Sequence, residues 1–310
     1  MTTADETGRS AAENSNRWRT DAAHAARLDA ELPDLAWPGL PAGATRFGFP
    51  APSGRLAAFS LGDESAERVV LVPGVTGSKE DFGLLAPLLV EAGYFVQSYD
   101  LAGQYESADA GPSPASGEHY DYALFVDDLV AFLEAGSPAH VLGYSFAGIV
   151  AELVLAARSD LIRSLTLLTT PPLAGESFRG VRWIGPFSRL ASGRTAASLM
   201  IWGIVTNKNR VQPMRLEFVR ARFDRTRRTS VDDVIGLMKR APDVTPALRA
   251  SDKPMLVAVG NHDLWPLRLH AHFAERIGAR LGVYTTGHSP CETAPHQLAA
   301  DMLRLFERSA

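Results

Sequence analysis

Residues 142–148 read Leu142-Gly143-Tyr144-Ser145-Phe146-Ala147-Gly148 and form the most informative stretch of the chain. The preceding apolar run is typical of a strand, and residues 145–157 have the apolar spacing of a helix. A serine at so sharp a turn from strand to helix needs small neighbours, and Gly143 and Ala147 provide the space. A serine that only caps the following helix would give the same local pattern, so this stretch alone does not establish any chemistry.

Strands and helices alternate in both directions from this turn. Apolar runs that predict strands occur at 69–72, 94–99, 140–142, 161–168, 255–259 and 281–284, and helical spacing occurs at 81–92, 121–135, 145–157 and 294–307. Residues 46–49 and 55–59 predict a hairpin before the first of these strands. The alternation indicates parallel strands joined by right-handed crossovers, and therefore an α/β sheet covered by helices on both faces.

One long stretch interrupts the alternation. Between residues 172 and 251 no strand is apparent, whereas 198–205, 214–223 and 231–239 have helical spacing. We therefore predict a core at 36–172 and 252–310, and a helical cap at 173–251 that would cover the carboxyl edge of the sheet. Residues 1–35 are polar, and we expect an N-terminal extension that adds little to the core.

The composition limits the functions that are open to the chain. Its 310 residues are 46% hydrophobic and 21% charged with a net charge of −4, which predicts a folded protein and no dedicated nucleic-acid binder. The single cysteine, Cys291, excludes an internal disulfide and a cysteine-cluster metal site. We find no secretory signal and no apolar run of about 18 residues, so we expect a soluble, cytoplasmic protein without a membrane span.

Two residues near the C-terminal end provide chemical partners for the serine. Asp263 follows the apolar run at 255–259, and His288 follows the run at 281–284. A serine hydroxyl is a weak nucleophile near neutral pH, so His288 would take the proton of Ser145 while Asp263 orients the imidazole and stabilises its cation. Each residue alone is more simply a turn or N-cap residue, but all three together at strand ends favour a catalytic triad.

The stretch at 142–148 resembles the nucleophile elbow of the α/β-hydrolase superfamily, whose usual form is G-x-S-x-G, with Ala147 at the second glycine. The chain order Ser145, Asp263, His288 is also that of the superfamily. The resemblance covers about residues 45–309 and is greatest for the lid-bearing branch with a serine nucleophile, which includes esterases, lipases and thioesterases. It implies a mostly parallel eight-stranded sheet, a helical cap after the sixth strand, and no metal or organic cofactor.

Two further loops extend the resemblance. Residues 72–78 resemble the oxyanion loop of the superfamily, with Pro73 where a histidine is usual, and the resemblance implies that the N–H groups of Val75 and Phe146 donate to the oxyanion. A phosphate-binding loop is the alternative for this turn, but the lysine followed by Ser or Thr is missing. Residues 100–107 resemble the D-x-x-G-x-G-x-S turn of lid-bearing members, with Tyr105 at the second glycine, and we assign this turn no chemistry.

Candidate substrate contacts are aromatic or apolar residues of the cap and of the loops beside the triad. They are Tyr144, Trp183, Leu199, Trp202 and Trp265. The residues in the cap could equally anchor it to the core. Residues 207–240 hold ten basic against four acidic side chains, which predicts either a solvated cap face or attraction of an anionic substrate.

These observations together predict a serine hydrolase. The substrate would be a small molecule with an ester, thioester or related acyl bond, cleaved through an acyl-enzyme. Cleavage of amide or C–C bonds needs the same triad, and a receptor-like protein with negligible turnover could retain it, so these alternatives stay open. A serine rather than an aspartate at the elbow argues against the haloalkane dehalogenase and epoxide hydrolase branches.

Overall fold

A single eight-stranded sheet forms the centre of the protein, in the order β1-β2-β4-β3-β5-β6-β7-β8. The computed structural model describes residues 17–33, 39–113, 115–181 and 213–308. The strands are β1 (Thr45–Ala51), β2 (Gly54–Leu61), β3 (Glu67–Val72), β4 (Tyr94–Tyr99), β5 (Ala139–Tyr144), β6 (Ile162–Leu168), β7 (Met255–Gly260) and β8 (Arg280–Tyr284). Only the pairs β1–β2 and β2–β4 are antiparallel, which confirms the predicted mostly parallel sheet.

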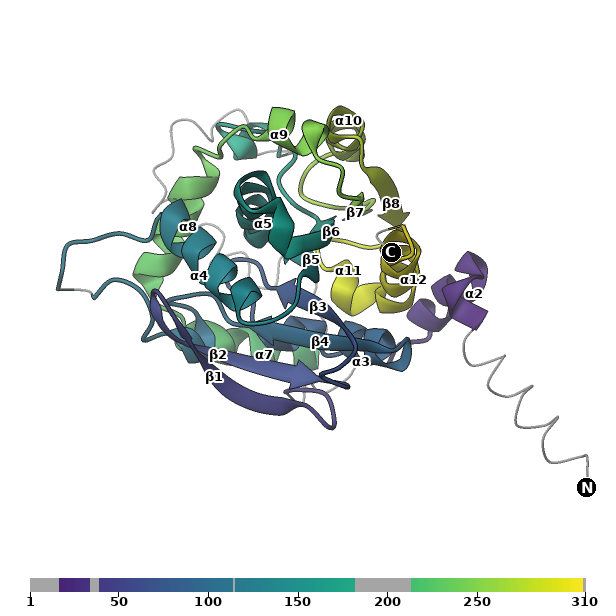
Figure 1. Ribbon diagram of the computed structural model, residues 1–310, viewed down its shortest axis with the longest axis horizontal. Coiled ribbons are helices and arrows are strands. Elements are labelled where there is room, and N and C mark those ends of the chain that lie inside the picture. Colours follow the sequence, from purple (N-terminus) through teal and green to yellow (C-terminus); the bar gives the residue numbers. More distant parts are fainter. Residues whose placement is uncertain (1–16, 34–38, 114, 182–212, 309–310) are drawn as a thin grey trace, which may run out of the picture.

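Helices cover both faces of the sheet (Figure 1). One face packs against α4 (Tyr122–Glu134), α5 (Phe146–Ala157), α9 (Thr245–Ala250) and α10 (Leu267–Ile277). The other face packs against α3 (Leu85–Glu91) and α12 (Pro295–Phe306), the latter preceded by the short α11 (Pro290–Thr293). Because both faces are buried, the central strands are apolar at nearly every position, as the sequence shows for β3, β5 and β7.

Helices also dominate the described part of the predicted cap, residues 173–181 and 213–251. The helices α7 (Pro213–Asp224) and α8 (Arg228–Met238) confirm the helical patterns at 214–223 and 231–239. The only β pairing in this described part is an isolated bridge between Gly175 and Ala241. The helix expected at 198–205 lies outside the described residues, and the limits of the cap as a domain stay a prediction.

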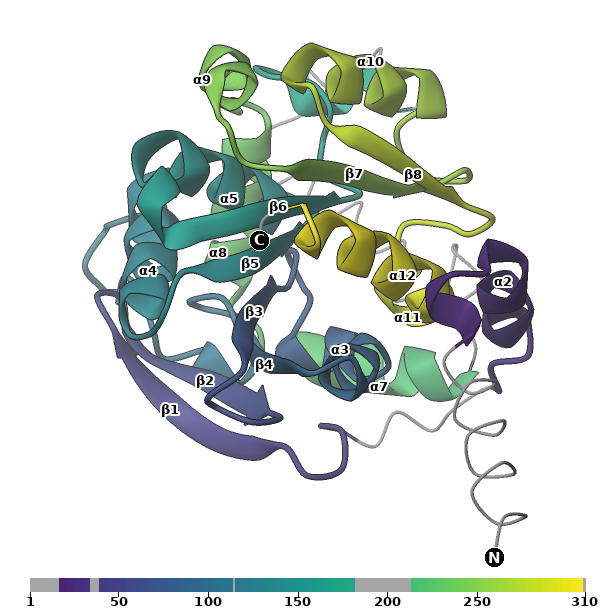
Figure 2. The ribbon, with the colours of Figure 1, turned by 45° about the vertical axis from the view of Figure 1, so that its right-hand side comes forward.

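The described part of the N-terminal extension contributes more to the core than its composition suggests. A 3₁₀ turn, η1 (Arg17–Arg19), and a helix, α2 (Ala22–Ala30), pack against α12, and Figure 2 shows α2 beside α12. Trp18 is 2% exposed and Ala25 is fully buried. The Asp29 carboxylate accepts hydrogen bonds from the backbone N–H groups of His296 and Gln297, at 2.9 and 3.1 Å, in the first turn of α12. Our expectation of a segment that adds little to the core is therefore wrong at Trp18 and Ala25.

The lengths and hydropathy of the helices determine whether any of them could span a membrane. No helix among the described residues is both long and apolar enough to span a lipid bilayer.

Candidate active site

Ser145 occupies a strained turn between β5 and α5. Its backbone has φ 53° and ψ −117°, a region that costs a residue with a side chain about 1–3 kcal/mol. A Cβ at position 143 would lie 2.5 Å from the carbonyl oxygen of Ala147, so only glycine fits there. The N–H of Ser145 donates to the carbonyl oxygen of Leu168 on β6 at 2.8 Å, which holds the strained residue to the sheet. The predicted elbow therefore has the tight geometry that its small residues indicate.

The side chains of Ser145, His288 and Asp263 lie in hydrogen-bond contact. His288 Nε2 is 3.2 Å from Ser145 Oγ, and His288 Nδ1 is 2.5 Å from Asp263 Oδ1. The three residues follow β5, β8 and β7, whose carboxyl ends lie at one edge of the parallel part of the sheet. The Asp263 side chain is fully buried, whereas that of His288 is 25% exposed. The arrangement gives a serine hydroxyl a proton acceptor, and gives that acceptor a carboxylate on its far side.

The charge of Asp263 follows from its surroundings. Burial of its carboxyl would raise the pKa, but the nearby charge of His288 and hydrogen bonds from His270 and His288 hold it well below the ordinary 3.8. Asp263 is therefore ionised and accepts hydrogen bonds only. Nδ1 of His288 must then carry a proton toward Asp263 in either charge state, and in the neutral imidazole Nε2 is free to accept the Ser145 hydroxyl proton.

The loop that follows β3 lies against the elbow. A Cβ at Gly74 would lie 3.0 Å from both the Cβ of Ser145 and the carbonyl oxygen of Tyr144, so Val75, the next residue, is held beside the serine. Phe146 opens α5, where the first N–H groups of a helix have no partner within the helix. The two N–H groups expected to donate to an oxyanion thus belong to segments that meet at Ser145.

The turn after β4 anchors this loop. Gln104 is fully buried, and its side-chain oxygen accepts the N–H of Thr76 at 2.7 Å, where Thr76 has a positive φ of 61°. The Asp100 carboxylate accepts the backbone N–H of Lys79 at 2.7 Å and its ammonium at 2.9 Å. The turn at 100–107, to which we assign no chemistry, thus positions residues 76 and 79 of the neighbouring loop.

Comparison with known proteins identifies the family. A family model described as alpha/beta hydrolase family matches residues 69–301 of the chain. The chain belongs to the alpha/beta hydrolase family. No curated protein sequence matches this hydrolase.

Solved structures share the fold of the hydrolase at low sequence identity. A hydrolase from Pseudomonas aeruginosa PA01 matches with TM-score 0.67 and 21% identity, covering 85% of this chain and 98% of that one. A thermophilic esterase from Thermogutta terrifontis matches with TM-score 0.66 and 21% identity, covering 86% and 99%. An epoxide hydrolase from Vigna radiata matches with TM-score 0.68 and 13% identity, covering 86% and 98%. At these identities the likeness shows the fold alone.

Two of the five predicted substrate contacts lie beside the triad, and three lie outside the described residues. Tyr144 is 8% exposed, its hydroxyl is 2.8 Å from Ser289 Oγ, and its ring centroid is 5.6 Å from that of His288. Trp265 is 1% exposed, its ring centroid is 6.2 Å from that of His288, and its indole N–H donates to the Ser177 carbonyl oxygen at 2.7 Å. Trp183, Leu199 and Trp202 lie within residues 182–212, which the structure does not describe.

Two basic residues of the predicted cap pair with carboxylates of the core. Arg222 on α7 is 5% exposed and forms an ion pair with Asp81, and its guanidinium also donates to Ser78 Oγ at 3.1 Å. Arg215 lies on the same face of α7 about two turns earlier, and it pairs with Asp81 at 3.0 Å and with Glu292 on α11. These two cations of α7 are not part of a solvated face, because they tie the helix to the loops that flank the triad.

His270 and Gln104 are site residues that the sequence analysis did not identify. His270 lies on α10 and is fully buried, with Nε2 2.7 Å from Asp263 Oδ2. A histidine on the buried face of an amphipathic helix has no local signature that separates it from a core residue. A glutamine in a turn has none either, so both needed the positions of neighbouring segments.

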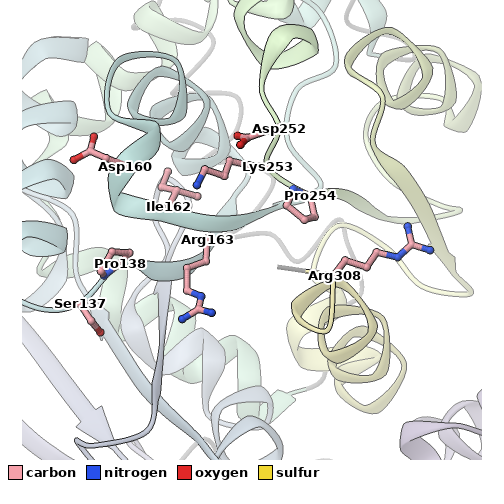
Figure 3. A pocket seen from close by; sticks show the side chains of 9 residues that line it. All are labelled: Ser137, Pro138, Asp160, Ile162, Arg163, Asp252, Lys253, Pro254 and Arg308. Carbon is pink, nitrogen blue, oxygen red and sulfur yellow. The ribbon is translucent and has the colours of Figure 1, made fainter. Parts of the chain in front are cut away.

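A groove of about 430 Å³ lies at the opposite, amino-terminal edge of the sheet, where Ser137, Ile162 and Pro254 line it (Figure 3). It includes no triad residue, so it is separate from the candidate active site. Among the described residues, no group of three or more His, Cys, Asp and Glu side chains is arranged to hold a metal ion.

Proposed function

We propose that this hydrolase cleaves a small ester, thioester or related acyl substrate through an acyl-enzyme on Ser145, with His288 and Asp263 as its catalytic partners. The observation that supports the proposal best is the double contact of one imidazole, with Nε2 3.2 Å from Ser145 Oγ and Nδ1 2.5 Å from Asp263 Oδ1. A hydroxyl, a base and a buried carboxylate that are hydrogen-bonded in this order form the general arrangement for nucleophilic acyl transfer.

Acylation begins when the substrate carbonyl carbon approaches Ser145 Oγ. His288 Nε2 takes the hydroxyl proton while Oγ forms a bond to that carbon, and the carbonyl oxygen becomes an oxyanion. The N–H groups of Val75 and Phe146 donate to this oxyanion, and the N-terminal end of α5 adds its positive dipole. The tetrahedral intermediate collapses when His288 returns the proton to the leaving alcohol or thiol.

Deacylation repeats these steps with water. His288 takes a proton from the water molecule, whose oxygen attacks the acyl carbon, and then gives the proton back to Ser145 Oγ as the carboxylic acid leaves. Ionised Asp263 stabilises the imidazolium in both halves. A serine acyl-enzyme is a simple ester that water can cleave, which favours acyl substrates over the ring-opening chemistry of branches with a carboxylate nucleophile.

A fluorophosphonate probe and p-nitrophenyl esters test the proposal directly. The wild-type hydrolase should take one phosphonyl label and release p-nitrophenol, and Ser145→Ala should do neither. Ser116→Ala replaces an exposed serine and should behave as the wild type. Labelling that survives Ser145→Ala, or a folded wild type that never reacts, would remove the assignment. Acyl chains from two to about twelve carbons then define the substrate, since each methylene buried adds about 0.8 kcal/mol.

A further inference from the structure

We infer that His270 is a positioning residue that fixes the carboxylate of Asp263 for catalysis, an inference that rests on the proposed function. His270 Nε2 is 2.7 Å from Asp263 Oδ2, and both side chains are fully buried. The series of hydrogen-bonded side chains therefore continues from Ser145, His288 and Asp263 to a fourth side chain, on α10. In the part of the chain that the structure describes, neither Ser145 nor His288 forms a hydrogen bond with His270, so its effect on the reaction passes through Asp263.

The two oxygens of the Asp263 carboxylate are divided between two imidazoles. Oδ1 lies 2.5 Å from His288 Nδ1, and Oδ2 lies 2.7 Å from His270 Nε2. Rotation of the carboxylate about its Cβ–Cγ bond would lengthen both hydrogen bonds at once. A carboxylate held at one oxygen alone could rotate about that contact, so the second imidazole sets the plane in which Oδ1 faces His288.

The protonation of His270 at Nε2 follows from the charge of its partner. Burial opposes ionisation of Asp263, but its pKa stays well below the ordinary value because of the His288 charge and the two histidine hydrogen bonds. An ionised carboxylate has no proton to donate, so His270 Nε2 must carry the hydrogen of this contact. Without that donor, Oδ2 would be a buried charged oxygen with an unmet acceptor, which is costly.

The other nitrogen of His270 argues against a role in packing alone. Nδ1 is buried, and it has no hydrogen-bond partner among the residues that the structure describes. A leucine at the same site would fill space without burying this polar atom. Among the described residues, the imidazole thus buries one polar nitrogen without a partner, and the hydrogen bond to Asp263 offsets this cost.

The residues around His270 hold its imidazole in place beside Asp263. It lies in the first half of α10 (Leu267–Ile277), whereas Asp263 lies in the loop that precedes this helix. The Trp265 ring contacts the His270 ring edge-on at 6.5 Å between centroids, and it lies 6.2 Å from the His288 ring. Trp265 therefore borders both imidazoles that contact Asp263. A group on a helix holds a loop residue more accurately than another loop would.

Two polar variants test this inference without a large change in packing. In His270→Gln the amide nitrogen can reach the former position of Nε2, whereas in His270→Asn the shorter amide cannot. We expect His270→Gln to keep most of the wild-type kcat. His270→Asn and His270→Leu should lose about 10- to 100-fold in kcat, the rate equivalent of one hydrogen bond to a charged group, while KM changes by less than about twofold.

Two controls separate positioning from general destabilisation. His272→Leu makes the same change at an exposed site on α10 and should leave kcat unchanged. In the background of Asp263→Asn, His270→Leu should cause no further loss, because its target carboxylate is already gone. Equal loss of kcat in His270→Gln, His270→Asn and His270→Leu, or no loss in any of them, overturns the inference. Absence of Ser145-dependent turnover in the wild type is a different result, and it overturns the proposed function as well.

Discussion

The buried carboxyl of Glu152 should make the hydrolase less stable as the pH rises. Glu152 lies on α5 and is 6% exposed, and its Oε1 has no hydrogen-bond partner among the described residues. Burial, with a smaller effect from the charge of Asp243, raises the pKa of Glu152 from 4.5 to about 8. The folded protein therefore holds this proton over a pH range in which the unfolded chain has released it.

The sign and size follow from these two pKa values. Well below pH 4.5 the carboxyl is protonated in both states and its ionisation costs no stability. Between pH 4.5 and about 8 the unfolded chain loses the proton first, so the free energy of unfolding falls with rising pH. At 1.36 kcal/mol for each pKa unit, the loss is about 1 kcal/mol at pH 5 and about 3 kcal/mol at pH 7.

Urea unfolding of the wild type and of Glu152→Gln between pH 5 and pH 8 measures this effect. The neutral amide removes the titration, so the variant should gain about 2 kcal/mol on the wild type between pH 5 and pH 7. Taking the difference at each pH cancels other titrating groups, and Glu64→Gln, at an exposed site, should show no such gain. A difference between Glu152→Gln and the wild type that stays constant over this range would refute the reasoning.

Three other substitutions test the loops and the cap. Asp263→Asn should keep the fold, as measured by circular dichroism, and lower kcat by about 10⁴, whereas a loss below tenfold would indicate another acid. Gln104→Leu releases the N–H of Thr76 and should lower kcat/KM by about tenfold on a p-nitrophenyl ester, and an unchanged rate would show that the loop needs no such anchor. Arg222→Met removes one partner of buried Asp81 and should cost about 3 kcal/mol in urea unfolding. This loss in the free energy of unfolding is at the low end for a broken buried ion pair because Arg215 still pairs with Asp81. A variant as stable as the wild type would contradict the prediction.

The strands and the elbow could be predicted because their causes are local. Strands buried on both faces must be apolar along their length, and this property is visible in any window of the sequence. The strained conformation of Ser145 requires glycine at 143 because of atoms only a few residues away. The family resemblance rests on the same local requirements, and the eight-stranded sheet follows from them.

The parts that could not be predicted depend on contacts between distant segments. The hydrogen bond from Thr76 to Gln104 joins two loops that are 28 positions apart in the chain. His270 and Asp263 are only seven positions apart, but their contact depends on how the loop between β7 and α10 turns. Neither contact has a periodic pattern. Trp18 is a single large apolar residue in a polar stretch, and its burial needs a helix from the other end of the sequence.

The dependence of α2 on α12 has a consequence for biosynthesis. Asp29 and its partner His296 are separated by 267 positions. The ribosome therefore makes Asp29 long before it makes the N–H groups that donate hydrogen bonds to the Asp29 carboxylate. At 5–20 residues per second, the interval is on the order of 10 to 50 s. Throughout that time the apolar face of Trp18 and Ala25 has no surface of α12 to cover it. The docking of this segment on α12 is therefore a late step of folding during translation, because it cannot occur before residues 295–306 are made.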